Sequence, residues 1–265
     1  MLLIKRMLFG VQKEKKYQIS AACVSHRGKI RKKNEDNLYF LSDYLPLEHE
    51  GTMGIIDRIF VTDNEAVGIF DGMGGESAGE LASYVAVKSF SELVKLQKIE
   101  QRYVYELLNE VNKVVCEKAR ERKISLMGTT ASIIFFENNN AIIINLGDSP
   151  IYLFRKNKLQ RISQPHTNET WLKENNINKK PALTQFLGLN QDGMLLEPYL
   201  KKIQIQKKDI YLICSDGLTD MVTEKQIQNI LKNRKSVKEK TKELLECALE
   251  NGGIDNITII LCEVG

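Results

Sequence analysis

Acidic side chains lie at the ends of short apolar runs at five places along this chain of 265 residues. In chain order they are Glu35, Asp36, Asp71, Asp148, Asp216 and Asp255. Carboxylates gathered at the ends of buried strands repel one another and resist ionisation. Hard divalent cations such as Mg²⁺ and Mn²⁺ take oxygen ligands and would neutralise such a group. The pattern therefore predicts a metal centre made of carboxylates.

Glycines accompany these acidic residues. Asp71 opens the segment DGMGG, and later acidic residues lie in GDS, SDG and GGIDN. A glycine lets a backbone carbonyl approach a metal and lets the chain turn sharply, here into a helix expected to begin near Glu76. One Asp-Gly pair alone is more typical of an ordinary turn after a strand. The four segments together, in this order, favour the metal site.

Other catalytic chemistries lack their motifs in this sequence. It contains no D-x-D-x-[TV] aspartyl-phosphate motif and no G-x-x-x-x-G-K-[ST] phosphate loop. The five cysteines and three histidines are scattered, which argues against a zinc site. Because several cysteines lie in apolar runs, we expect buried, reduced thiols and a cytoplasmic protein.

The composition is that of an ordinary globular chain, with 43% hydrophobic and 27% charged residues. No apolar run approaches the roughly 18 residues of a transmembrane helix, so we expect no integral membrane segment. We predict a basic leader over 1–16, too weakly apolar for a signal peptide, and a single catalytic domain over 17–265. A weak contact of the leader with a membrane surface stays open.

Charge is unevenly distributed along the chain. The net charge is +4, but residues 1–33 hold ten basic residues and one acidic residue, so they carry +9 and the remainder carries −5. This basic segment has no interleaved stacking aromatics and no nucleic-acid reader motif. We therefore expect no nucleic-acid partner, and interpret the segment as a solvated face or a patch for an anionic ligand.

Short apolar runs rich in Ile, Val and Phe predict strands. They cover residues 17–24, 59–61, 67–70, 131–136, 141–146, 151–154, 210–214 and 257–261. The run of Asn138, Asn139 and Asn140 predicts a hairpin turn and therefore antiparallel pairing. This pattern indicates an α+β fold with antiparallel sheets.

Three segments space their apolar residues at helical intervals, over 76–96, 102–122 and 237–250. Ser236 and Glu239 form a capping box at the start of the third segment. Residues 163–200 hold three of the five prolines and the only tryptophan. We interpret them as an irregular excursion with one short helix around Glu169–Glu174.

Six segments, taken in order and spacing, resemble the metal-dependent protein phosphatase family, the type 2C Ser/Thr phosphatases, and its compact bacterial-type branch in particular. They are RGKIRKKNED, VGIFDGMGGESAG, MGTTAS, NLGDS, ICSDGLTD and GGIDNIT. Each segment alone is a weak signal, whereas the set is highly specific. The resemblance runs from Tyr17 to Val264, nearly the whole chain.

The resemblance implies a four-layer αββα sandwich of two antiparallel sheets flanked by helical pairs. It also implies a centre of two Mg²⁺ or Mn²⁺ ions between the sheets. Asp71 would bridge both ions, and the Gly72 carbonyl would bind one of them. Asp216 and Asp255 would hold the first ion.

The remaining positions follow from the same resemblance. Glu35 or Asp36 would support the second ion, partly through water. Asp148, together with Asp216, matches the positions of a third, weaker metal site. Arg31 matches the arginine that clamps the substrate phosphate, and a guanidinium offers the bidentate donors that phosphate needs.

The sequence departs from the family pattern at three positions. Met73 stands where other members carry a histidine suited to general acid work, so the acid is unassigned. His166 falls near a frequent Asp-His pair, but we interpret it as structural. Pro150 replaces a common arginine. The excursion over 163–200 corresponds to the family's variable flap, which is expected to touch the substrate.

The function implied is hydrolysis of phosphoserine and phosphothreonine in proteins by in-line attack of a water or hydroxide that bridges the two ions. Substrates would be the products of a Ser/Thr protein kinase, and the enzyme would be a monomer. Two alternatives stay open: a pseudophosphatase that only binds phosphoproteins, and a phosphatase of small phosphorylated molecules. Retention of every metal carboxylate argues against the first.

Overall fold

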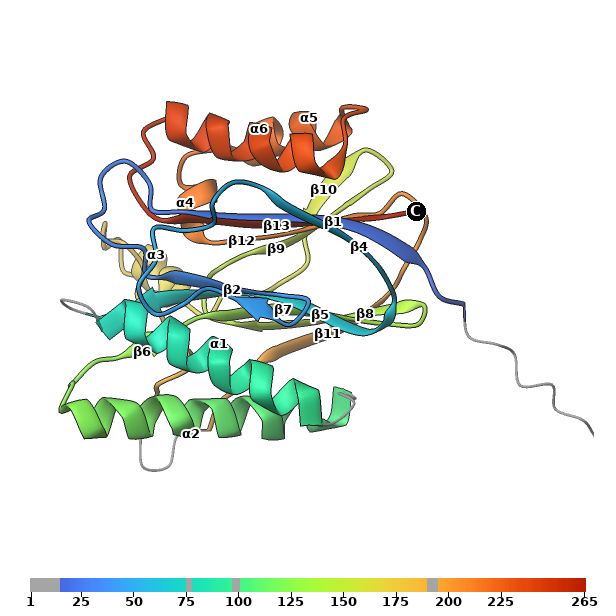
Figure 1. Cartoon of the computed structure of the whole chain (residues 1–265). Helices are drawn as coiled ribbons and strands as arrows, with labels where there is room; N and C mark the ends of the chain where they lie inside the picture. Colours follow the sequence, from blue (N-terminus) through green and yellow to red (C-terminus); the bar gives the residue numbers. More distant parts are fainter. Residues whose placement is uncertain (1–14, 75–77, 97–100, 190–194) are drawn as a thin grey trace, which may run out of the picture.

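Two antiparallel β-sheets pack face to face in the computed structural model, which describes residues 15–74, 78–96, 101–189 and 195–265 (Figure 1). One sheet has the strand order β10-β9-β12-β13-β1-β4, and the other has the order β11-β8-β7-β5-β2-β3, with β6 paired to β5. The strands are β1 (Gln18–His26), β2 (Asp36–Phe40), β3 (Asp43–Tyr44), β4 (Ile56–Val61), β5 (Asp63–Met73), β6 (Gly128–Thr129), β7 (Ala131–Glu137), β8 (Asn140–Leu146), β9 (Ile151–Arg155), β10 (Lys158–Arg161), β11 (Tyr199–Gln204), β12 (Ile210–Cys214) and β13 (Ile257–Val264).

Helices cover the outer face of each sheet (Figure 1). The described helices are α1 (Ala78–Leu96), α2 (Val104–Arg122), α3 (Glu169–Glu174), α4 (Asp216–Thr219), α5 (Glu224–Lys232) and α6 (Val237–Glu250), and a 3₁₀ turn over Gln101–Tyr103 leads into α2. The pair α1 and α2 lies on the sheet that contains β5, and α5 and α6 lie on the sheet that contains β1. The predicted four-layer αββα sandwich is confirmed.

Both faces of the central strands are buried, which explains why the sequence shows continuous apolar runs. Along β1, Ile19, Ala21 and Cys23 point into the core between the sheets. Ala22 and Val24 point the other way, into the core under α6. Successive side chains of a strand face opposite sides, so a strand covered on both sides needs apolar residues at every position.

The predicted capping box and the predicted hairpin turn both occur in the structure. Ser236 accepts a hydrogen bond from the Glu239 backbone and completes the capping box that begins α6. The hairpin turn joins β7 to β8, with Asn138 at a φ of 53° and Asn140 already in the strand. The expected start of the first helix near Glu76 lies outside the described residues.

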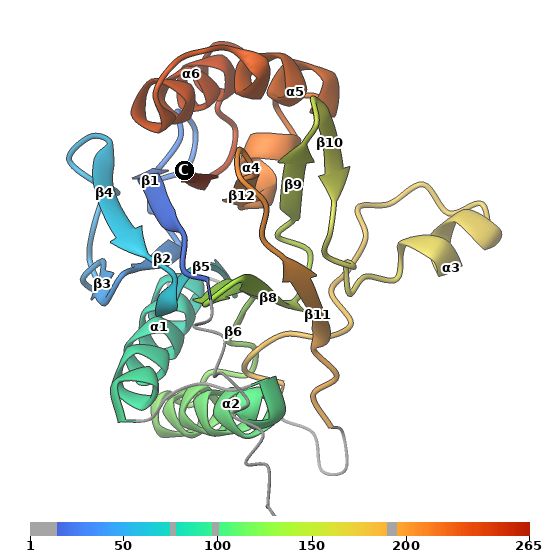
Figure 2. The same ribbon diagram turned by 90° about the vertical axis from the view of Figure 1, so that its right-hand side faces the viewer.

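The excursion over 163–200 leaves the sandwich and carries α3 away from it, as Figure 2 shows on the right of the molecule. It returns through Leu187, whose backbone makes two hydrogen bonds of 2.9 Å with Thr129. Most of the predicted leader lies outside the described residues. Over the described part of the chain, no helix combines the length and the apolar content needed to cross a bilayer. All five cysteines are free thiols.

Candidate metal centre and phosphate site

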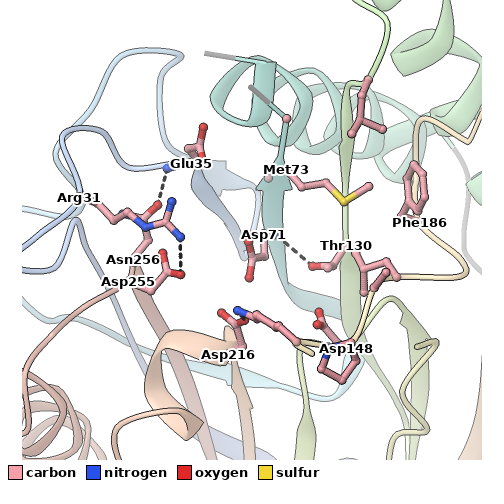
Figure 3. Close-up of a pocket in the computed structure, with 17 residues that line it drawn as sticks. Arg31, Glu35, Asp71, Met73, Thr130, Asp148, Phe186, Asp216, Asp255 and Asn256 are labelled. Atoms are coloured by element: carbon pink, nitrogen blue, oxygen red, sulfur yellow. Dashed lines mark hydrogen bonds and ion pairs between the residues drawn. The ribbon is translucent and has the colours of Figure 1, made fainter. Parts of the chain in front are cut away.

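A cleft of about 500 Å³ opens at one edge of the sandwich, where both sheets present strand ends (Figure 3). Five of the six predicted carboxylates line it: Glu35, Asp71, Asp148, Asp216 and Asp255. The predicted phosphate clamp, Arg31, lies on the same cleft. Residues from five separate parts of the chain therefore meet at one place.

The sixth carboxylate, Asp36, lies directly behind the cleft and is only 1% exposed. It stands opposite Asp71 in the ladder between β2 and β5. Burial, with a smaller contribution from the charges of Asp216 and Asp255, raises the pKa of Asp36 to about 7 against the hydrogen bonds that lower it. One of those bonds comes from the Thr258 hydroxyl, 2.7 Å from Oδ2.

Asp71 lies among the other carboxylates of the cleft. Burial raises its pKa well above the ordinary value, and the charges of Asp36, Asp216, Asp148 and Asp255 raise it further, in that order. A carboxylate surrounded by carboxylates is favourable only when cations or protons neutralise the group. Asp71 therefore gains from a bound cation.

Two threonines fix the backbone of Asp71, a role that sequence reasoning did not assign although it singled out the segment MGTTAS. The Asp71 amide donates to Thr130 Oγ1 at 3.0 Å. The Thr129 hydroxyl and the Thr130 amide both donate to the Asp71 carbonyl at 2.9 Å. These three bonds hold the end of β5 where the carboxylate enters the cleft.

The backbone around Gly72 is packed too closely to leave room for a side chain. A Cβ at this position would lie 2.1 Å from the Gly79 carbonyl oxygen and 2.5 Å from that of Glu35. The Gly72 amide donates to the same Glu35 carbonyl at 3.1 Å. Glycine therefore lets the end of β5, the start of α1 and the Glu35 loop meet at one edge of the cleft.

Asn256 joins the two segments that carry Arg31 and Asp255, and sequence reasoning missed it. Its side-chain amide donates to the carbonyls of Arg27 and Lys33 at 2.8 and 2.9 Å. Its Oδ1 accepts from the Glu35 amide at 2.8 Å. A buried amide with both donors and its acceptor satisfied is typical of a residue that anchors a loop, and no local sequence signal showed these partners.

Two basic side chains, Arg31 and Lys180, form ion pairs with carboxylates of the cleft. The Arg31 guanidinium lies 2.6 Å from Asp255 Oδ2, a contact that raises the pKa of Arg31. Lys180, from the excursion, lies 3.1 Å from Asp216 Oδ2, and the charge of Asp216 raises its pKa. Sequence reasoning did not assign Lys180, since nothing local links it to Asp216.

Asp148 closes the far side of the cleft from the turn after β8. Burial raises its pKa to about 6, with a further contribution from Asp216. The turn is held by His166, whose Nδ1 accepts from the Gly147 amide at 3.2 Å, and by Arg161, which donates to the Asp148 carbonyl at 2.9 Å. His166 thus has the structural contact that we expected of it.

The donor set fits hard divalent cations. Every acidic group that lines the cleft offers oxygen, the type of ligand that Mg²⁺ and Mn²⁺ prefer. Within the described residues, the acidic, histidine and cysteine side chains form no compact group of three. The acidic side chains are instead spread around the cleft, where Arg31 pairs with Asp255 and Lys180 pairs with Asp216. Bound metal ions would replace Arg31 and Lys180 as the positive partners of these carboxylates.

Oxygen donors and an arginine around one open cleft, set between two sheets, define a metal-dependent enzyme for phosphorylated substrates. The chain belongs to the protein phosphatase 2C family, whose model matches residues 57–259. It is therefore a metal-dependent protein serine/threonine phosphatase, and the predicted family and enzyme class are confirmed.

Relatives and solved structures agree with this assignment. The serine/threonine phosphatase stp of Listeria welshimeri is 32% identical over 253 residues, covering 89% of this chain and 92% of that protein. The phosphatase PstP of Mycobacterium tuberculosis is 29% identical over 256 residues, 92% of this chain and 44% of PstP. The PstP catalytic domain, solved with two manganese ions, matches at a TM-score of 0.74 and 27% identity, covering 93% of this chain and 99% of that domain. A Streptococcus agalactiae serine/threonine phosphatase shares the fold at a TM-score of 0.78 and 22% identity, covering 93% of this chain and all of that one.

Proposed function

We propose that the carboxylate cleft hydrolyses phosphoserine and phosphothreonine in proteins, with Mn²⁺ or Mg²⁺ held by Asp71, Gly72, Asp216 and Asp255. Glu35 supports the ion set from the cleft wall, and Asp36 does so from behind Asp71. The observation that carries the proposal is the perturbation of Asp71, which burial and four neighbouring carboxylates make dependent on a cation. The manganese ions of the PstP domain support the same choice of metal.

A bound pair of divalent cations supplies Lewis-acid stabilisation and an acidified water at neutral pH. The chain's own residues position the substrate. Arg31 has a side chain that is 48% exposed on the open side of the cleft, so its guanidinium reaches both Asp255 and an incoming phosphate. Bidentate donation from a guanidinium fixes the orientation of the phosphoryl group.

The Met73 thioether cannot supply the proton that a serine or threonine leaving oxygen needs. Asp148 faces the cleft from the opposite side and has a pKa of about 6. We assign Asp148 to the leaving-group side of the reaction, together with its predicted part in a third, weaker metal site.

The substrates we infer are phosphoproteins made by a Ser/Thr protein kinase, and we infer a monomeric enzyme in the cytoplasm. The five free thiols support a reducing compartment. Sedimentation of the purified chain measures the oligomeric state, and a dimer at micromolar concentration would overturn the monomer. Fractionation of cells tests the location.

One assay tests the function directly. A phosphothreonine peptide and p-nitrophenyl phosphate are each incubated with the enzyme in Mn²⁺, Mg²⁺, Ca²⁺ or chelator. We expect turnover of both substrates with Mn²⁺ or Mg²⁺ and none after exhaustive chelation. Full activity in chelator would refute the mechanism. Turnover of p-nitrophenyl phosphate without turnover of any phosphopeptide would point to small phosphorylated substrates.

A further inference from the structure

The wall of the cleft that faces the carboxylates is apolar. It is formed by Met73, Leu126, Pro181, Leu183 and Phe186, which line the same cleft as Arg31 and Asp71. Leu126 is 54% exposed. Water-exposed apolar surface inside a concave site is unfavourable unless a ligand covers it, and such surface marks binding sites.

Close packing holds this apolar wall in place. Met73 extends toward Phe186 in Figure 3, and both lie against Gly128. A Cβ at Gly128 would lie 2.6 Å from the Phe186 ring and 3.0 Å from the Met73 methyl group. The missing side chain therefore lets a methionine and an aromatic ring from distant parts of the chain approach the same point.

Backbone hydrogen bonds fix the segment that carries the wall. Thr129 and Leu187 exchange two bonds of 2.9 Å directly after Phe186. The Thr184 amide donates to the His166 carbonyl at 2.9 Å, next to Leu183. The Gly188 amide donates to Asn112 Oδ1 on α2 at 2.7 Å. The apolar surface is thus attached to the sandwich on both sides of Phe186.

A phosphoryl group cannot use this wall. Its charge is matched at the other side of the cleft by Arg31 and the metal-binding carboxylates. The wall itself is uncharged, and the two cations that share the cleft with it, Arg31 and Lys180, are already paired with carboxylates. A carboxylate placed against the wall would therefore lose hydration without gaining a partner. An aliphatic or aromatic side chain is the group that gains from contact here.

We propose that Met73, Leu126, Leu183 and Phe186 form a specificity subsite that takes an apolar side chain adjacent to the phosphorylated residue of the substrate. This inference rests on the proposed protein phosphatase activity and adds a sequence preference to it. Segments with a leucine-like residue beside the phosphothreonine are preferred over segments with alanine or aspartate there.

The test uses phosphothreonine peptides in an alanine background, with leucine or aspartate placed singly at each of the two positions on either side. The measured quantity is the ratio of kcat/KM for each peptide to that of the all-alanine peptide. For at least one position we expect leucine to raise kcat/KM about tenfold, the usual size of an added apolar contact in a pocket. Aspartate at that position lowers it.

Leu126→Ser removes the most exposed part of the wall and should bring the leucine ratio close to 1. Phe186→Ser is a second variant, used when its thermal melt matches that of the wild type. Ile59→Ser is the matched control, because Ile59 is 67% exposed on β4, the edge strand of the opposite sheet. The Ile59→Ser variant should prefer the leucine peptide over the all-alanine peptide as strongly as the wild type does.

The outcomes separate this inference from the proposed function. A wild-type enzyme that hydrolyses the all-alanine peptide equally well with leucine at every position overturns the subsite and leaves the phosphatase intact. A leucine preference that persists unchanged in Leu126→Ser overturns it too. Failure to hydrolyse any phosphopeptide with Mn²⁺ present overturns the proposed function instead.

Discussion

Asp36 and Asp71 face each other across the ladder between β2 and β5, one carboxylate directly opposite the other. Like charges at opposed positions of a sheet destabilise it. Asp36 is buried and Asp71 is partly buried, and burial is the first cause of the raised pKa of each. This pair makes the stability of the sheet dependent on what neutralises the carboxylates.

The first prediction concerns pH. Burial raises the pKa of Asp36 from 3.8 to about 7 in the folded protein. Between these values the folded state binds more protons than the unfolded chain, so the free energy of unfolding falls as pH rises through this window. We expect the Tm of the chelator-treated protein to fall by about 5 °C or more from pH 4.5 to 7.5.

Saturating Mn²⁺ should offset most of that fall near pH 7, because the cation replaces the protons. Thermal melts with chelator and with Mn²⁺ measure both effects. Asp36→Asn is the matched control, since it keeps the shape and removes the titrating charge. A metal-free Tm that is flat or rises across the window in the wild type would contradict the prediction.

The second prediction concerns the metal ligands. Asp71→Asn and Asp216→Asn should each lower kcat by at least about 100-fold, a loss of about 2.7 kcal/mol in transition-state stabilisation. Both variants should keep the fold, because removing a charge relieves repulsion among the remaining carboxylates. Steady-state kinetics and circular dichroism check the two statements, with Asp43→Asn in β3 as the control. Retention of a tenth of the activity would remove the residue from the ligand set.

The third prediction concerns Arg31. Arg31→Ala should raise the KM for a phosphopeptide about tenfold with a smaller fall in kcat, because a phosphate clamp binds substrate and transition state alike. The Tm should change by less than about 2 °C, since half-exposed ion pairs contribute about 0–1 kcal/mol. Arg31→Lys should restore only part of the KM. An unchanged KM in Arg31→Ala would move the clamp to another cation, such as Lys180.

The fourth prediction concerns Asp148. Asp148→Ala should lower turnover of a phosphopeptide more than turnover of p-nitrophenyl phosphate, because an aryl leaving group needs little protonation. Both substrates are measured with the same variant, and bound metal is counted by calorimetry. Equal losses would place Asp148 in the main metal centre. No loss on either substrate would leave it as a turn residue.

The fifth prediction concerns Asn256, whose side-chain polar atoms are all paired with the protein backbone. Asn256→Ala removes three hydrogen bonds from a buried amide and should cost about 2–3 kcal/mol of unfolding free energy. Asn251→Ala, at an exposed amide, should cost much less. Urea denaturation measures both. A similar cost for the two variants would show that Asn256 does not anchor the loop.

Local signals explain what could be predicted of the fold. The helices over 104–122 and 237–250 follow from apolar spacing and a capping box, and the central strands follow from their apolar runs. The edge strands β10 and β11 could not be predicted from the sequence because they are polar and partly exposed. Only their backbone pairing defines them. The helix α4 could not be predicted because its four residues are too few to show a helical spacing of apolar side chains.

Some residues of the candidate site could likewise be predicted from local sequence features, and others could not. Asp71 and Gly72 could be chosen from one segment, since an acidic residue and a glycine after an apolar run are local features. The contact between Arg31 and Asp255 joins residues 224 positions apart, and only the family resemblance linked them beforehand. Lys180 and Asn256 act through partners on other segments, so no spacing rule could find them.

The strand order has a consequence for the time at which this enzyme can become active. The last strand, β13, does not lie at an edge but between β12 and β1, and it pairs with β1 over eight positions. Asp255 directly precedes it. β1 can pair early with β4, but β13 must leave the ribosome before β1 gains its second neighbour and the cleft acquires Asp255. Because such distant pairing slows folding, we expect the nascent chain to stay inactive, and exposed to chaperones and proteases, until β13 has been made and has paired.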